Sequence, residues 1–297
     1  MKNRVQEFLH YHENIKQKSP HTVKAYDVDL RQFIAYLRKH EEVETLEKIE
    51  EHHIKSFIAY LYHENVTKRS INRKISTIKS FFHYLMSQKQ VEKDITLTLV
   101  VPKFSKKLPT VLTREEIDKM RESIDVKEFS GIRNRMIIEL LYSSGLRASE
   151  LLSICEGDIQ FSSREIRVMG KGEKQRDVFF SNTAYEWITY FITQKRLKGF
   201  GEKHLVVNQN GEPLSDRSLR RIIEDISKSV GISKHVSPHT FRHSFATHLM
   251  NRGVDLRYIQ ALLGHEHITT TEVYTHVSRE KLKEELEKHH PFIEKER

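Results

Sequence analysis

The chain has 297 residues, of which 50 are Lys or Arg and 41 are Asp or Glu, so its formal net charge is +9. This length is typical of two domains, and the basic surplus fits a polyanion as partner, although a mildly basic soluble enzyme would show the same surplus. The single cysteine excludes an internal disulfide, and the sequence shows neither a signal-peptide pattern nor a membrane-spanning apolar run, so we expect a soluble cytoplasmic protein with no membrane partner.

The first hundred residues place apolar side chains at helical spacing. Ser19 is a typical N-cap and Pro20 a typical first helical residue, because that position leaves its N–H unpaired in any case. Together with a helix around Phe8 and Leu9, three apolar stripes predict a bundle of four helices. The stripes are Val23, Tyr26, Leu30, Phe33, Ile34 and Leu37; Ile54, Phe57, Ile58 and Leu61; and Ile71, Ile75, Ile78, Phe82 and Leu85.

One of these predicted helices is strongly cationic. Residues 68–79 contain five basic side chains and no acidic one: Lys68, Arg69, Arg73, Lys74 and Lys79. A solvated surface would explain such a face, but an acid-free run in a basic chain favours contact with a DNA backbone. We therefore expect these five residues to face DNA.

A domain boundary is indicated by residues 101–116, where two prolines and a lysine cluster interrupt the helical pattern. Thr113 and Glu116 have the spacing of a capping box, which starts a new helix. We expect three segments: an N-terminal helical domain over 1–101, an extended basic linker over 102–112 and a second domain over 113–297.

The second domain mixes helices with a small sheet. Helical patterns fill residues 114–156, whereas residues 158–182 alternate apolar and polar side chains around a turn rich in glycine and charge. Alternation around Ile166 before the turn and Val178 after it predicts a small antiparallel sheet. Helical patterns return from residue 183, so we expect a mostly α protein whose second domain is α+β.

Residues 237–253 predict an amphipathic helix that Ser237 caps and Gly253 ends. Its buried stripe has four members: Phe241, Phe245, Leu249 and Met250. His239 and Arg242 are three residues apart and share another face near the N-terminus. Helix N-termini attract anions, so this end of the helix is suited to hold a phosphate.

Two further polar side chains lie where predicted helices meet turns. Gly145 stops one helix and Arg147 begins the next, and Glu150 one turn on either holds the arginine in place or forms a surface ion pair with it. Gly264 is a predicted C-cap, and His265 follows it directly. Both side chains are therefore placed by element ends, where they can be held rigidly and still be exposed.

Two more candidates follow the same rule. Tyr274 lies in the first turns of a helix for which Thr269 and Glu272 form a capping box. Lys171 lies at the turn of the predicted hairpin, and Lys174 and Arg176 are equally suited to its role.

Other interpretations compete with a reactive site. His239 and His243 have the helical spacing of zinc ligands, but the stretch lacks the glutamate of zinc proteases and the chain lacks a cysteine set, so we expect no metal. Buried histidines and tyrosines satisfied by hydrogen bonds are a second interpretation. A helix-turn-helix DNA reader around Gly253 is a third, and it leaves His265 and Tyr274 without a role.

The chain resembles the tyrosine site-specific recombinases over its full length, and most closely the bacterial Xer group. The resemblance rests on five motifs in this order: GLRASEL, GKGEKQR, SPHTFRHSFATHLMNRG, LLGH and TTTEVYTHV. The resemblance implies a helical, SAM-like core-binding domain followed by an α+β catalytic domain. It matches six residues to the catalytic positions of the family, with the tyrosine as nucleophile: Arg147, Lys171, His239, Arg242, His265 and Tyr274.

The resemblance implies cutting and rejoining of double-stranded DNA at a specific recombination site through a 3′-phosphotyrosyl intermediate, without cofactor, metal or ATP. It also implies a homo-tetramer, or a hetero-tetramer with a sister recombinase, that resolves chromosome or plasmid dimers. The alternatives are a phage or mobile-element integrase of the same chemistry, a type IB topoisomerase and a non-catalytic DNA-binding regulator.

The C-terminal tail carries a narrow apolar stripe: Val277, Leu282, Leu286, Phe292 and Ile293. A strip this thin suits docking into a groove. In the resembling family this segment docks on the neighbouring protomer, and docking on its own domain is the alternative.

Overall fold

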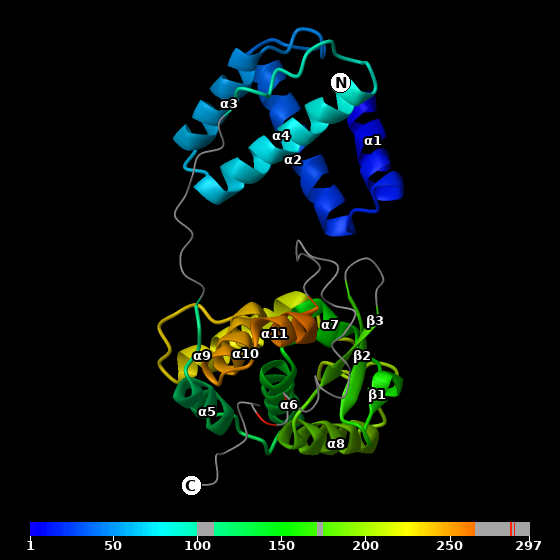
Figure 1. Ribbon diagram of the computed structural model, residues 1–297, viewed down its shortest axis with the longest axis vertical. Helices are drawn as coiled ribbons and strands as arrows, with labels where there is room; N and C mark the ends of the chain where they lie inside the picture. The colour runs from blue at the N-terminus through cyan, green and yellow to red at the C-terminus, as the bar shows by residue number, and fades with distance from the viewer. Residues whose placement is uncertain (100–109, 171–174, 265–285, 287, 289–297) are drawn as a thin grey trace. The chain divides into compact units, whose positions relative to one another are not determined.

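A computed structural model of the chain describes residues 1–99, 110–170, 175–264, 286 and 288 (Figure 1). It divides into two compact units, Met1–Lys107 and Leu108–Arg297. The division falls within the stretch 102–112 that the sequence predicts as a linker. Among the helices of the described residues, none combines the length and the apolar character that a membrane crossing requires.

The N-terminal unit consists of helices around one apolar core. α2 begins as predicted, because the Ser19 side chain accepts a hydrogen bond from the Thr22 amide and Pro20 is the first helical residue. α2 packs against each of the other α-helices, and the predicted stripes supply the core, which confirms the four-helix bundle for the described residues. The elements are α1 (Lys2–His10), a π-helical turn (Tyr11–Ile15), α2 (Pro20–His40), α3 (Glu51–His63) and α4 (Lys68–Ser87).

One carboxylate is buried inside this unit. Asp29 on α2 is 1% exposed, and its Oδ1 accepts a hydrogen bond from Lys74 Nζ of α4 at 2.8 Å. Arg73 and the Thr77 hydroxyl both donate to the other oxygen, Oδ2. We call Asp29, Arg73, Lys74 and Thr77 the Asp29 cluster. Because an unpaired buried charge is costly, this cluster fixes α2 against α4.

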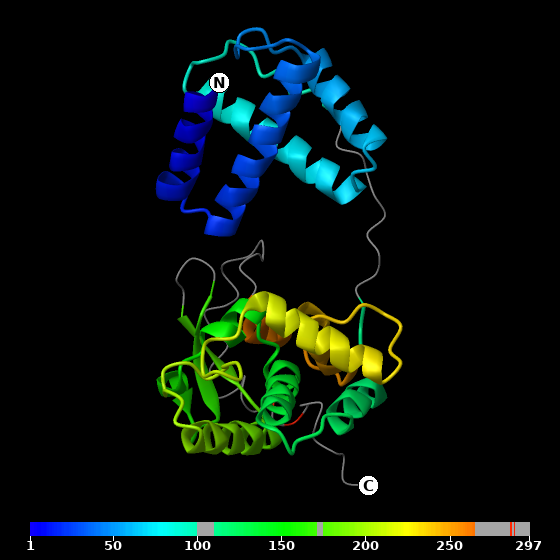
Figure 2. The same ribbon diagram turned by 180° about the vertical axis from the view of Figure 1, so that it is seen from behind.

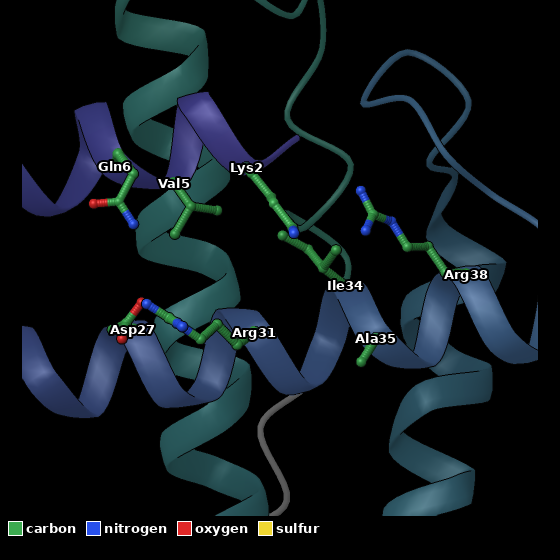
Figure 3. A pocket seen from close by; sticks show the side chains of 8 residues that line it. All are labelled: Lys2, Val5, Gln6, Asp27, Arg31, Ile34, Ala35 and Arg38. Atoms are coloured by element: carbon green, nitrogen blue, oxygen red, sulfur yellow. The ribbon is translucent and has the colours of Figure 1, made fainter.

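A groove of about 300 Å³ lies between α1 and α2 (Figure 3). Part of its lining is apolar, since Val5 and Ile34 are buried residues of the core. Asp27 pairs with Arg31 there at 2.7 Å. The cations that line the groove are Lys2, Arg31 and Arg38. The unit therefore carries positive charge beside α1 as well as along α4.

The second unit is built around α6. This helix lies between α8 and α10 and packs against both (Figures 1 and 2). Most of its side chains are buried, as expected of a helix enclosed by neighbours. The helices are α5 (Arg114–Glu122), α6 (Phe129–Ser144), α7 (Ala148–Ser153), a 3₁₀ turn (Glu156–Asp158), α8 (Asn182–Leu197), α9 (Asp216–Ser229), α10 (Pro238–Asn251) and α11 (Leu256–Leu263).

A small antiparallel sheet completes this unit, as predicted. Its strands are β1 (Ile159–Gln160), β2 (Glu165–Met169) and β3 (Gln175–Phe179), in the order β1-β2-β3. Ile166 lies opposite Val178, and both are buried against the core. The pairing of β2 with β3 thus fixes which side chains of β3 face inward.

α10 and α11 enclose a second, smaller apolar cluster that includes Phe245 and Leu249. Met250, predicted to share their stripe, is instead 53% exposed, so that prediction is wrong. Met250 follows Phe241 by nine residues, which at 3.6 residues per turn places it about half a turn round the helix. Leu286 is 4% exposed within this cluster, so this residue of the tail docks on its own unit.

Candidate active site

Arg147 is held at the start of α7. α6 ends at Gly145, whose φ of +62° lies in the left-handed region that favours glycine, so the predicted helix stop is confirmed. Arg147 is the N-cap of α7, and its backbone N–H donates to Glu150 Oε2 at 2.8 Å. Its Nη1 donates to Glu150 Oε1 at 2.6 Å. Glu150 therefore orients Arg147, as the sequence predicts.

Glu150 lies among three arginines. Its side chain is 2% exposed, and its Oε2 accepts a hydrogen bond from Arg176 Nη2 at 2.9 Å. The same oxygen lies 4.0 Å from Arg242 Nη1. We call Arg147, Arg176 and Arg242 the arginine cluster. One carboxylate cannot neutralise three guanidiniums, so the group keeps a net positive charge suited to an anion.

Arg242 joins the ends of two other helices. It lies on α10 and is buried, with its side chain 6% exposed. Its Nη1 donates to the Gly145 carbonyl at 2.7 Å, and its Nη2 donates to the Leu263 carbonyl at 2.5 Å. The end of α6, the N-terminal part of α10 and the end of α11 are therefore fixed together by one guanidinium.

The end of α11 is where the sequence places it. Gly264 is the C-cap with a φ of +64°. Its carbonyl accepts a hydrogen bond from Arg147 Nη2 at 3.1 Å. The arginine cluster thus fixes the chain up to the residue before His265, which itself lies outside the described residues.

Burial and mutual repulsion set the protonation of this group. Burial, with the charges of Arg147 and Arg176, lowers the pKa of Arg242 to about 9. Burial also lowers the pKa of Arg176, against the opposing effect of Glu150. Burial acts to raise the pKa of Glu150, but the charge of Arg176 and the contacts with Arg147 outweigh it, and the pKa is lowered. Both Arg242 and Glu150 are therefore ionised at neutral pH.

His239 lies in the first turn of α10 and is exposed. Its Nε2 is 2.9 Å from the Nε2 of His243, four residues on. Partial burial, followed by the charges of His243 and Arg242, lowers the pKa of His239. Its ring is then mainly neutral at pH 7 and can accept a proton. Within the described residues, no group of three or more His, Cys, Asp or Glu side chains is arranged to hold a metal ion.

Three of the six residues matched to catalytic positions belong to the described part of the chain. Arg147 and Arg242 come from distant segments and converge on Glu150. His239 is on the same helix as Arg242. The other three lie outside the described residues: Lys171, His265 and Tyr274.

The sequence offers Arg176 only as an alternative to Lys171, whereas the structure places it in the arginine cluster. It lies on β3 opposite Val168, with its side chain 15% exposed. The signal was available, because Arg176 precedes the buried Val178 by two residues and alternation puts both on one face of the strand. A charged residue at an inward position of a strand indicates a buried partner.

The cationic helix of the N-terminal unit is only partly as predicted. Lys68, Arg69 and Arg73 are exposed on α4. Lys74 is 6% exposed within the Asp29 cluster, so the prediction that it faces DNA from the surface is wrong. Lys79 is half-buried and donates to a backbone carbonyl at 2.7 Å. The exposed charge of this helix is therefore concentrated in its first turns.

Comparison with known families gives two matches. Residues 110–281 match the phage integrase family, and residues 5–89 match the N-terminal SAM-like domain of phage integrases. The two matched segments correspond to the two units of the structure, and the first covers more than half of the chain.

Relatives are similar along almost the whole chain. Tyrosine recombinase XerD of Halalkalibacterium halodurans is 34% identical over 292 residues, covering 97% of this chain and 98% of the relative. Tyrosine recombinase XerC of Chlamydia caviae is 36% identical over 303 residues, covering 96% and 97%. Among solved structures, XerH site-specific recombinase bound to a palindromic difH substrate is 26% identical with a TM-score of 0.69, over 88% of this chain and 78% of that chain.

Proposed function

This chain belongs to the phage integrase family and is a site-specific tyrosine recombinase, and from that premise we propose that Tyr274 cuts DNA by forming a covalent 3′-phosphotyrosyl bond. The observation that carries the proposal is the convergence of Arg147 and Arg242 on Glu150. Two guanidiniums that stay charged match the oxygens of one phosphate, and they stabilise the negative charge that grows during attack.

The proposed reaction exchanges one phosphate ester for another. The Tyr274 oxygen bonds to phosphorus as the bond to the 5′ oxygen breaks, which leaves a free 5′-hydroxyl. A 5′-hydroxyl from a partner strand then attacks the phosphotyrosine and releases Tyr274. The number of phosphate esters is conserved, so the reaction requires no ATP, and we assign it no cofactor and no metal.

Tyr274 must lose its proton as it attacks. With a reference pKa near 10, forming the phenolate at pH 7 costs about 4 kcal/mol. We assign the proton to a histidine, either His239 or His265, and the lowered pKa of His239 leaves its ring mainly neutral and therefore able to accept the proton. We assign Lys171 as the donor of a proton to the leaving 5′ oxygen.

We further propose that the chain resolves chromosome or plasmid dimers, since its relatives include proteins named XerC and XerD. Its partner is double-stranded DNA with a recombination site, bound in the cytoplasm as a tetramer of identical subunits or with a sister recombinase. The match to the phage integrase family favours integration of a mobile element as the second candidate. The two roles share the chemistry and differ in the DNA that is joined.

The test begins by sequencing the DNA fragments that the purified protein binds. A duplex of that site, nicked beside the cleaved phosphate, releases a short fragment and traps the covalent complex. We expect the wild type to form this adduct, and Tyr274→Phe to bind the duplex without forming it. Tyr190→Phe, at an exposed tyrosine of α8, is the matched control and keeps the adduct. EDTA should leave adduct formation unchanged.

Three other results would point elsewhere. Binding of the site without any adduct would indicate a DNA-binding regulator. Relaxation of supercoiled plasmid without site preference would indicate a topoisomerase. Loss of the adduct in EDTA would indicate a metal-dependent reaction.

A further inference from the structure

The side chain of Arg176 connects three segments of the second unit. It lies on β3 and is 15% exposed. Its Nη2 donates to Glu150 Oε2 at 2.9 Å, and its Nη1 donates to the Leu262 carbonyl at 2.7 Å. Its stem lies against Gly264, where an added Cβ would come within 2.8 Å of Arg176 Cδ. One guanidinium therefore contacts α7 and the last turn of α11.

Arg176 is close in the sequence to one assigned catalytic residue and contacts the segment that precedes another. Lys171 precedes Arg176 by a few residues in the sequence, between the end of β2 and the start of β3. Gly264, against which it packs, directly precedes His265. An arginine suits this place because its planar fork donates in two directions at once, whereas a lysine ammonium has a single nitrogen.

Arg176 and Arg147 share the carboxylate of Glu150 as hydrogen-bond acceptor. Glu150 Oε1 accepts from Arg147 Nη1, whereas Oε2 accepts from the Arg147 backbone and from Arg176. Without Arg176, the carboxylate loses a partner that holds it between α7 and β3. It would then be free to turn further onto Arg147 and to neutralise the guanidinium assigned to phosphate.

We propose that Arg176 is a positioning residue for strand cleavage, which holds Arg147 and the end of α11 in place through Glu150 and the Leu262 carbonyl. This inference rests on the proposed function. Arg176 acts through Arg147, and the phosphate is contacted by Arg147 and Arg242. Misplacement of a reacting group by about 1 Å can slow a reaction about 100-fold, which sets the size of the expected effect.

The test uses the full-length protein and the nicked duplex described above. Arg176→Met removes the charge and every hydrogen bond while keeping an unbranched side chain. We expect covalent adduct to form about 100-fold more slowly, with DNA affinity within about threefold of wild type. Arg167→Met is the matched control, because Arg167 lies on the neighbouring strand β2 with its side chain 51% exposed. It should keep the wild-type rate.

A second substrate separates positioning from general loss of structure. A methylphosphonate at the cleaved position removes one charged oxygen, so the reaction depends less on the guanidinium of Arg147. We expect the defect of Arg176→Met to shrink from about 100-fold on phosphate to less than about 10-fold on methylphosphonate. Arg176→Lys keeps the charge but cannot bridge both acceptors. We expect it to slow adduct formation less than Arg176→Met does, and again less on methylphosphonate than on phosphate. If Arg176→Met does not fold, Arg176→Lys provides the test of the positioning role.

The outcomes separate this inference from the proposed function. An adduct in the wild type with an unchanged rate in Arg176→Met would overturn the positioning role alone. Equal slowing on both substrates would also overturn it, since that is the result of a merely structural contact. Absence of the adduct in the wild type would overturn the proposed function instead.

Discussion

Asp29 in the N-terminal unit and Glu150 in the second unit are both buried carboxylates among cations, but the two groups differ in their excess of positive charge. In the N-terminal unit, Asp29 meets Arg73 and Lys74, and Lys74 is buried with it. In the second unit, Glu150 meets three guanidiniums, and the side chain of Arg147 is 37% exposed.

This difference separates a structural contact from a ligand site. In the Asp29 cluster, donors from α4 occupy both oxygens of an acid on α2, so the group joins two helices. Asp29 meets two cations and Glu150 meets three, so the excess of positive charge is larger in the arginine cluster, where the partly exposed Arg147 gives an anion access to it. A buried ion pair by itself is weak evidence for either role, whereas the ratio of cations to carboxylates distinguishes the two groups.

The largest effect is expected from Asp29→Ala. This change leaves Lys74 buried without its carboxylate, which should destabilise the N-terminal unit by about 3–5 kcal/mol. Amide hydrogen exchange in α2 and α4 measures the loss within this unit. Asp27→Ala is the matched control on the same helix, because its partner Arg31 is 70% exposed and loses little when the pair is removed. Similar losses in both variants would remove the distinction between the two acids.

The next effect is expected in the arginine cluster from Arg242→Ala. Loss of a donor to the transition state should slow covalent adduct formation on the order of 10²–10³-fold, about 3–4 kcal/mol of barrier. DNA affinity should fall only slightly, since this interaction strengthens as the phosphate is attacked. Single-turnover trapping and a binding assay on the same duplex measure the two quantities.

Arg257→Ala provides the control for this change. Arg257 lies on α11 with an exposed side chain paired to Asp255, and its removal should leave the rate unchanged. If Arg242→Ala weakened binding and cleavage by the same factor, the assigned transition-state role would be wrong.

The smallest effect is expected on the surface of α4. Arg69 is exposed and Lys74 is buried in the Asp29 cluster. Each phosphate contact contributes about one to the slope of log affinity against log salt. Arg69→Ala should therefore lower that slope by about one, and Lys74→Met should leave it unchanged. A lower slope in Lys74→Met and an unchanged slope in Arg69→Ala would mean that Lys74 contacts the DNA backbone and Arg69 does not.

Local chemistry made several helix ends predictable. Ser19 accepts the hydrogen bond of an N-cap, and Thr113 and Glu116 form the predicted capping box. Gly264 adopts the left-handed conformation that ends α11. In each case the interacting residues are within a few positions of one another, so the sequence alone is enough to predict the contact.

Buried charges were harder to predict, although spacing carried a signal. Lys74 lies three residues after Ile71 and four before Ile78, on the apolar face of α4. The total charge of residues 68–79 does not distinguish this inward position from the exposed ones. What no local pattern encodes is the partner: Asp29 lies 45 residues away, and Arg242 meets a carbonyl 97 residues away.

The burial of Leu286 has a consequence for assembly. A subunit that lends its C-terminal residues to a neighbour must first withdraw Leu286 from the apolar cluster around Phe245. Exposing such a side chain costs about 1.5–3 kcal/mol, and filling the same cluster on an identical neighbour recovers it. Exchange of this segment between subunits would then change the free energy very little. The rate of exchange would depend on how often Leu286 leaves the cluster of its own subunit.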